Sequence, residues 1–126
     1  MLTGRCLCGG VAFQITGDLA PGSICHCGQC RRQGGHTWAS THIPEAALVF
    51  TAKDTLTWYE ATPGIRRGFC GRCGSFLFWN PEDEDKISVS MGALDPPTGG
   101  HIAKHIFTAH KGDYYDIDGA LPQVEN

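Results

Sequence analysis

Seven cysteines in a chain of 126 residues constrain the fold of this protein more than any other feature. They fall into three clusters, at residues 6–8, 25–30 and 70–73, and none is left over. An odd number of thiols cannot all pair within one chain. Residues 1–11 also lack the basic segment and apolar run of a signal peptide, so we expect a reducing compartment, where disulfides are rare. The clusters therefore predict metal binding.

The length of the chain predicts one folded domain over residues 1–126, because about 150 residues is the usual size of a domain. Hydrophobic residues make up 41% of the chain and charged residues 18%, which is typical of a globular protein. The net charge of -3 provides no basic field for nucleic acid or anionic lipid. The longest apolar run, Ala46–Phe50, is too short to span a membrane. We expect a cytoplasmic protein with neither nucleic-acid nor membrane partners.

Apolar residues alternate with polar ones in several short segments, which is typical of half-buried β-strands. Such alternation occurs at residues 11–15 and 56–58, and the continuous apolar run at 76–79 predicts a central strand with both faces covered. Residues 101–107 are also expected to be extended. Turn signals separate these segments and leave room for only one helical turn, after Pro44. The sequence predicts an all-β fold of short antiparallel strands joined by glycine-rich loops.

The first and third clusters each offer two thiols separated by one or two residues, which is the spacing of half of a tetrahedral metal site. We therefore pair Cys6 and Cys8 with Cys70 and Cys73 around one zinc ion, although thiolates also accept iron. Four protein ligands leave no position for a substrate, so this site is expected to be structural. It would close a loop of roughly sixty residues and so favour folding.

The middle cluster offers three thiols, from Cys25, Cys27 and Cys30, and leaves the fourth position of a tetrahedral ion open. An open position is what a catalytic zinc site requires. The alternative is a fourth protein ligand such as His26 or His36, which would make this site structural as well. Because His26 lies between two ligands, its side chain is expected to point away from the ion.

Two groups of residues have more than one interpretation. The doublets Arg31-Arg32 and Arg66-Arg67 either meet a small anionic substrate or keep the surface charged, and we favour the surface. The large aromatic side chains either line a substrate groove or pack in the core, and we favour the core because aromatic residues in strands are usually buried. These aromatic residues are Trp38, Trp58, Trp79, Phe69, Phe76 and Phe78.

Three motifs together resemble the glutathione-dependent formaldehyde-activating enzyme family, which also includes centromere protein V. They are Cys-x-Cys-Gly-Gly at 6–10, Cys-His-Cys-x-x-Cys-Arg at 25–31 and Phe-Cys-x-x-Cys-Gly-Ser at 69–75. The likeness extends from about Gly4 to Glu125. It implies a β-tent fold of Mss-like type. It also implies a structural zinc on the first and third cysteine pairs, and a catalytic zinc on the middle three cysteines.

The activity implied by this resemblance joins formaldehyde to glutathione to give S-hydroxymethylglutathione, which is carbon-sulfur lyase chemistry in reverse. Three thiolates give a zinc site a net charge of about -1, which favours a fourth, incoming thiol over activation of water. We expect this zinc-bound thiol to add to an aldehyde while a nearby donor stabilises the alkoxide.

The candidate donors for the alkoxide are His26, His36 and Arg31. Arg31 or Arg32 is also a candidate to hold a carboxylate of glutathione as the co-substrate. The alternative function, from a different class, is a zinc-stabilised module that binds a partner protein without catalysis.

Overall fold

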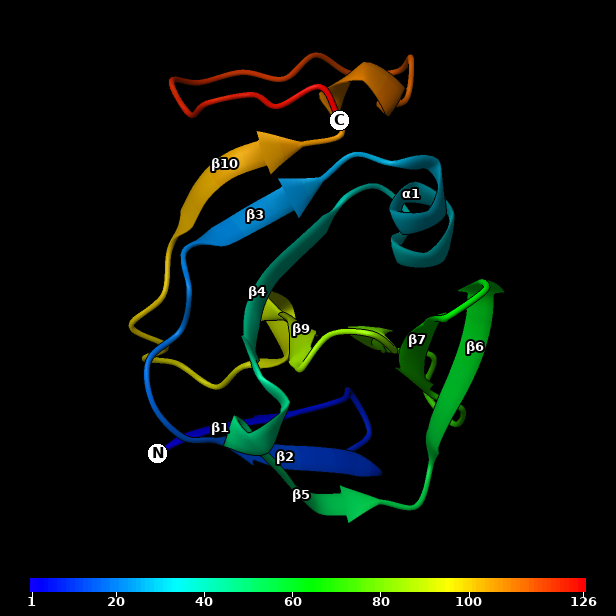
Figure 1. Ribbon diagram of the computed structural model, residues 1–126, viewed down its shortest axis with the longest axis vertical. Helices are drawn as coiled ribbons and strands as arrows, with labels where there is room; N and C mark the ends of the chain where they lie inside the picture. Colours follow the sequence, from blue (N-terminus) through cyan, green and yellow to red (C-terminus); the bar gives the residue numbers. More distant parts are fainter.

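Ten β-strands in two sheets make up most of the regular secondary structure, and one short α-helix interrupts them (Figure 1). The computed structural model describes residues 1–126. The smaller sheet is antiparallel and has the order β1-β2-β5, with β1 at Leu2–Arg5, β2 at Val11–Ile15 and β5 at Leu48–Lys53. The prediction of an all-β protein is confirmed.

The larger sheet has seven strands in the order β10-β3-β4-β9-β8-β7-β6. Their bounds are β3 Gly22–Cys25, β4 Trp38–Pro44, β6 Leu56–Thr62, β7 Ile65–Cys70, β8 Phe76–Pro81, β9 Lys86–Ser90 and β10 Ile102–Ile106. The strand expected at 76–79 is β8, which lies between β7 and β9 as a central strand should. Its Leu77 and Phe78 are fully buried.

The two sheets share one hydrophobic core. Alternation in β2 turns Val11, Phe13 and Ile15 inward, and all three are buried. The Phe13 ring meets Phe78 of the larger sheet edge-on, with the ring centroids 5.3 Å apart. This contact between aromatic rings fixes the small sheet against the large one.

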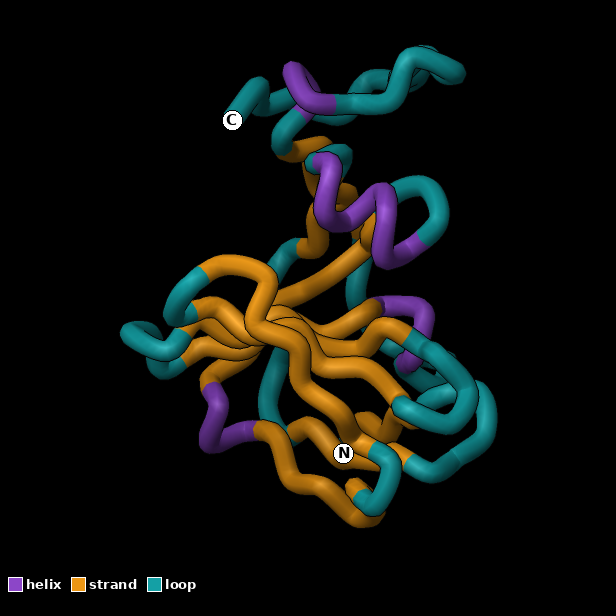
Figure 2. The backbone as a smooth tube through the Cα atoms, turned by 90° about the vertical axis from the view of Figure 1, so that its right-hand side faces the viewer, coloured by secondary structure: helices purple, strands orange, loops and turns teal.

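One strand pair departs from the antiparallel arrangement that we expected. β10 runs parallel to β3, with Ile106 opposite Cys25. The chain after β10 folds back over this edge, where Gln123 forms a bridge to His105. Figures 1 and 2 show the C-terminal segment stacked beyond β10, at the opposite end of the molecule from the small sheet. The C-terminal segment therefore covers what would be an open strand edge.

Helix α1, at Gly28–Gly34, was not expected from the sequence. It begins because the Cys27 side chain accepts a hydrogen bond from the backbone N–H of Cys30, and it ends at Gly35, whose φ of 88° is in the left-handed region. The helical turn expected after Pro44 is present as a 3-10 turn, η1, at Glu45–Ala47. Two more such turns are η2 at Met91–Ala93 and η3 at Thr108–His110.

Candidate metal sites and substrate cavity

The thiols of Cys6, Cys8, Cys70 and Cys73, here called the four-cysteine cluster, all lie within 4.8 Å of one another. The Sγ atom of Cys8 is 3.6 Å from that of Cys6 and 3.7 Å from that of Cys70. Bonds of about 2.3 Å from a tetrahedral ion to sulfur imply sulfur-sulfur edges of about 3.8 Å. A disulfide would be far shorter, and all seven thiols are free. This cluster could hold a metal ion with four protein ligands.

Neighbouring polar groups contact the sulfur atoms of the four-cysteine cluster. The hydroxyl of Thr55 lies 3.1 Å from Cys70 Sγ and lowers the pKa of the Cys70 thiol. Arg72 Nε donates a hydrogen bond of 3.2 Å to Cys8 Sγ. Such donors favour the thiolate form, which is the form that binds metal.

The thiols of Cys25, Cys27 and Cys30, here called the three-cysteine cluster, also lie within 4.8 Å of one another. Cys25 ends β3, Cys27 caps α1 and Cys30 lies in its first turn, so the junction of strand and helix brings the three together. Hydrogen bonds from Cys25 and Cys30 hold the pKa of the Cys27 thiol well below its ordinary range. No histidine joins the cluster, so three protein side chains are available there to bind a metal ion.

A cavity of about 920 Å³ opens beside the three-cysteine cluster, and all three of its cysteines line the wall. Most of the remaining wall comes from strands of the larger sheet. Trp38 and Trp79 belong to it. Trp38 is buried, as expected, but it also lines the cavity, whereas Trp79 is half-buried, so the favoured core interpretation is incomplete for both. A space of this size suits a small-molecule ligand, and it lies directly against the three thiols.

Residues 1–110 match the model of the family described as glutathione-dependent formaldehyde-activating enzyme. The chain belongs to this family. The resemblance noted in the sequence is thereby confirmed, and membership associates the protein with thiol and aldehyde chemistry.

A crystal structure of a Rhodobacter sphaeroides protein is similar to this member of the formaldehyde-activating family. The TM-score is 0.66 at 19% sequence identity, and the match covers 97% of this chain and 99% of the other. At this identity the likeness concerns the fold alone. A search of curated proteins gives no match. None of the helices in the structure has the length and apolar character needed to cross a membrane.

His26 lies between two cysteines of this family member, and its ring points to the C-terminal part of the chain instead of the cluster. Its Nδ1 is 2.5 Å from the Tyr115 hydroxyl and its Nε2 is 2.9 Å from Nδ1 of His105. Burial lowers the pKa of His26, which favours the neutral ring. Because both ring nitrogens have partners, His26 is free neither to bind a metal nor to stabilise an alkoxide.

The other candidates for stabilising the alkoxide or holding glutathione, which are His36, Arg31 and Arg32, lie outside the cavity wall. His36 is exposed, and its Nδ1 pairs with the Tyr114 hydroxyl at 2.7 Å. Arg31 is half-buried and Arg32 exposed, both on α1. Contact of either arginine with a glutathione carboxylate stays a prediction.

Arg67 is the charged residue of the site that sequence reasoning assigned wrongly. We expected the Arg66-Arg67 doublet at the surface, but Arg67 is 5% exposed and lines the cavity, whereas Arg66 is exposed. The signal was present, because neighbouring residues of a strand face opposite sides of the sheet. The other charged residue of the cavity wall, Lys104 of β10, is exposed.

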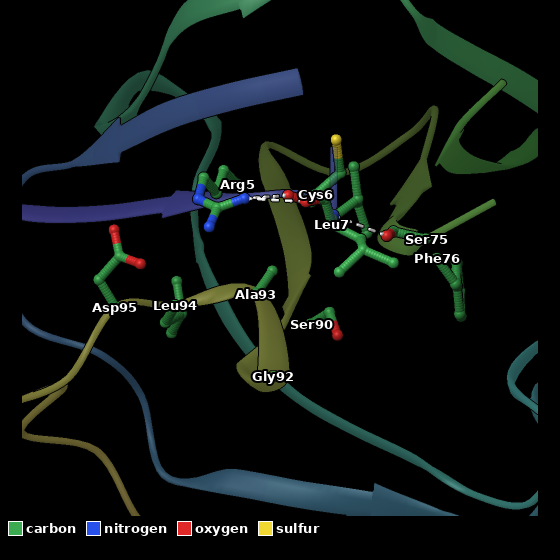
Figure 3. A pocket seen from close by; sticks show the side chains of 11 residues that line it. Arg5, Cys6, Leu7, Ser75, Phe76, Ser90, Gly92, Ala93, Leu94 and Asp95 are labelled. Atoms are coloured by element: carbon green, nitrogen blue, oxygen red, sulfur yellow. Dashed lines mark hydrogen bonds between the residues drawn. The ribbon is translucent and has the colours of Figure 1, made fainter. Parts of the chain in front are cut away.

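A second cavity, of about 410 Å³, lies beside the four-cysteine cluster (Figure 3). Arg5 reaches along its wall and donates hydrogen bonds of 3.1 and 3.0 Å to the backbone carbonyls of Cys6 and Leu7. The backbone N–H of Leu7 in turn donates to the Ser75 hydroxyl at 3.0 Å. These bonds hold the loop that carries Cys6 and Cys8, and so help to position two thiols of the four-cysteine cluster.

Proposed function

We propose that this protein binds two zinc ions and adds a small thiol, with glutathione as the candidate, to an aldehyde such as formaldehyde. The supporting observation is the three-cysteine cluster, whose three thiols face a cavity and have no fourth protein ligand. The four-cysteine cluster would hold a structural zinc, since its four ligands complete a tetrahedral site.

The chemistry of the donors fits zinc at both clusters. Thiolates are soft ligands that favour zinc. The sulfur spacings of the four-cysteine cluster match a tetrahedral ion, and the thiols of the three-cysteine cluster lie within 4.8 Å of one another. Bound by Cys25, Cys27 and Cys30, zinc would supply an open position that accepts a thiol and lowers its pKa. The cavity of about 920 Å³ leaves room for a ligand larger than formaldehyde.

The proposed reaction is the addition of a thiol across the C=O bond of the aldehyde. The thiol sulfur forms a bond to the aldehyde carbon, the π electron pair of C=O moves onto oxygen, and that oxygen gains a proton while the thiol loses one. The product is a hydroxymethyl thioether, and the reverse reaction breaks the carbon-sulfur bond, as a lyase does. The chain positions the sulfur through the cysteine ligands and supplies the walls that orient the aldehyde.

Exchange NMR with ¹³C-formaldehyde and glutathione tests the proposal, because it measures formation and breakdown of the adduct at equilibrium. The zinc-loaded protein is expected to raise the exchange rate above the spontaneous rate, and Cys27→Ser is expected to remove this increase. Circular dichroism of Cys27→Ser provides the control for folding. Equal exchange rates with the wild type and Cys27→Ser would refute the proposed catalyst.

A further inference from the structure

Arg67 is a buried cation in the wall of the cavity that contains the three-cysteine cluster. It lies on β7, is 5% exposed, and shares the wall with all three cysteines. A buried guanidinium is unfavourable unless anions or hydrogen-bond acceptors compensate for its lost hydration. The hydrogen-bond partners of Arg67 therefore show how far this loss of hydration is compensated.

Few of the hydrogen-bond donors of Arg67 are occupied. Its Nη1 lies 3.7 Å from Cys30 Sγ and 3.3 Å from Oε1 of Gln33. Its Nε is buried and has no partner. A guanidinium carries five N–H donors in a planar fork that suits an anionic oxygen. Arg67 can thus donate further hydrogen bonds without giving up its contact with Cys30.

The cavity wall contains no carboxylate to pair with Arg67. None of its 20 residues is aspartate or glutamate, although the chain has 13 acidic residues. The formally charged residues of the wall are Arg67 and Lys104. The anions available to the Arg67 guanidinium are therefore the cysteine thiolates and whatever occupies the cavity.

We propose that Arg67 is a catalytic residue that donates hydrogen bonds to the anionic oxygen formed when a thiol adds to the aldehyde at the three-cysteine cluster. This inference rests on the proposed function. The contact between Arg67 and Cys30 places the guanidinium beside the cluster, where the sulfur-carbon bond forms. The electron pair that leaves C=O collects on an oxygen one carbon away from that sulfur, within the reach of a neighbouring donor.

The expected loss of reaction rate on substitution of Arg67 follows from the negative charge that develops on this oxygen. Removing one donor to an oxyanion typically lowers the rate by about 100-fold or more. We expect that loss in Arg67→Gln and a smaller one in Arg67→Lys, which keeps a charge but not the fork. Arg66→Gln is the matched control, because Arg66 is the neighbouring arginine on β7 and is exposed.

A binding experiment tests Arg67 independently of catalysis. Mercaptoacetate carries its anionic oxygens close to sulfur, as the adduct does, whereas 2-mercaptoacetamide has the same shape without charge. Calorimetry on the zinc-loaded protein is expected to show mercaptoacetate binding at least about 10-fold more tightly, which equals about 1.4 kcal/mol. Arg67→Gln should remove that preference, and Arg66→Gln should keep it.

The outcomes separate the two proposals. If the wild type fails to accelerate adduct exchange but shows an Arg67-dependent preference for the anionic thiol, the reaction is wrong and Arg67 still binds anions at this site. If the wild type is active and Arg67→Gln changes neither rate nor preference, the role of Arg67 is refuted. Loss of one zinc ion from Arg67→Gln would also refute it, because Arg67 would then serve to hold the cluster.

Discussion

The ring of His26 contacts the hydroxyl of Tyr115 and so joins the cysteine-bearing loop to the C-terminal part of the chain. The second ring nitrogen of His26 contacts His105 on β10, which extends this polar network across the parallel strand pair. The loop that carries the three-cysteine cluster is thus tied to β10 and to the C-terminal part of the chain. Support of this kind keeps the ligands in place.

Tyr115→Phe is expected to lower the free energy of unfolding by about 1 kcal/mol, because it removes the partner of a buried ring nitrogen. Urea denaturation measures the change. Tyr114→Phe is the matched control, since Tyr114 is 58% exposed and its partner His36 is exposed too. An equal effect of the two substitutions would show that the His26 network does not stabilise the loop.

Removing a ligand from each cluster should have different consequences. Cys70→Ser is expected to release one zinc ion and lower the melting temperature strongly, because the four-cysteine cluster joins Cys8 to Cys70 across 62 positions of the chain. Cys27→Ser should also release one zinc ion but leave the fold intact. Metal analysis and thermal melting measure both effects.

The same experiment examines the alternative of a zinc-stabilised binding module. A protein that holds a single zinc ion, or that melts when either cluster loses its metal, would favour the module. Retention of the fold by Cys27→Ser would instead favour a site that is free for chemistry.

Gly68 lies where the chain leaves no room for a side chain. A Cβ atom at this position would be 2.8 Å from the Trp58 ring and 3.1 Å from Phe78. Gly68→Ala is therefore expected to lower stability by about 1–3 kcal/mol through overpacking. Chemical denaturation measures this loss.

Gly92→Ala provides the control for Gly68→Ala, because a Cβ atom at Gly92 has nothing within 4 Å and its backbone is not in the left-handed region. A change within about 0.5 kcal/mol is expected there. Tolerance of Gly68→Ala at the same level would contradict the packing of Trp58 against β7.

Local patterns predicted much of the fold. Alternation identified β2 and the apolar run identified β8, since both signals depend on which face of a strand is buried. The spacing of the three cysteine clusters along the chain predicted one group of four thiols and one of three, and the structure brings the same residues together. These features depend on short-range sequence and on the number of ligands that a metal needs.

Features that depend on distant parts of the chain were missed. Helix α1 begins with a cysteine cap, which ordinary capping signals do not include. The parallel pairing of β10 with β3 depends on how residues 94–101 cross the molecule, and local pattern does not encode that path. Strand alternation could have shown that Arg66 and Arg67 face opposite sides, but which of the two is buried became evident only once the fold had placed β7 beside the cavity.

The proposed function requires one accessible metal site and one closed site, and ¹¹³Cd NMR of the cadmium-substituted protein measures both at once. Two signals are expected, and added glutathione should shift one of them, while Cys27→Ser should lose that signal and keep the other. Two signals whose chemical shifts both stay unchanged when glutathione is added, or a single signal in the wild type, would contradict an open three-cysteine site.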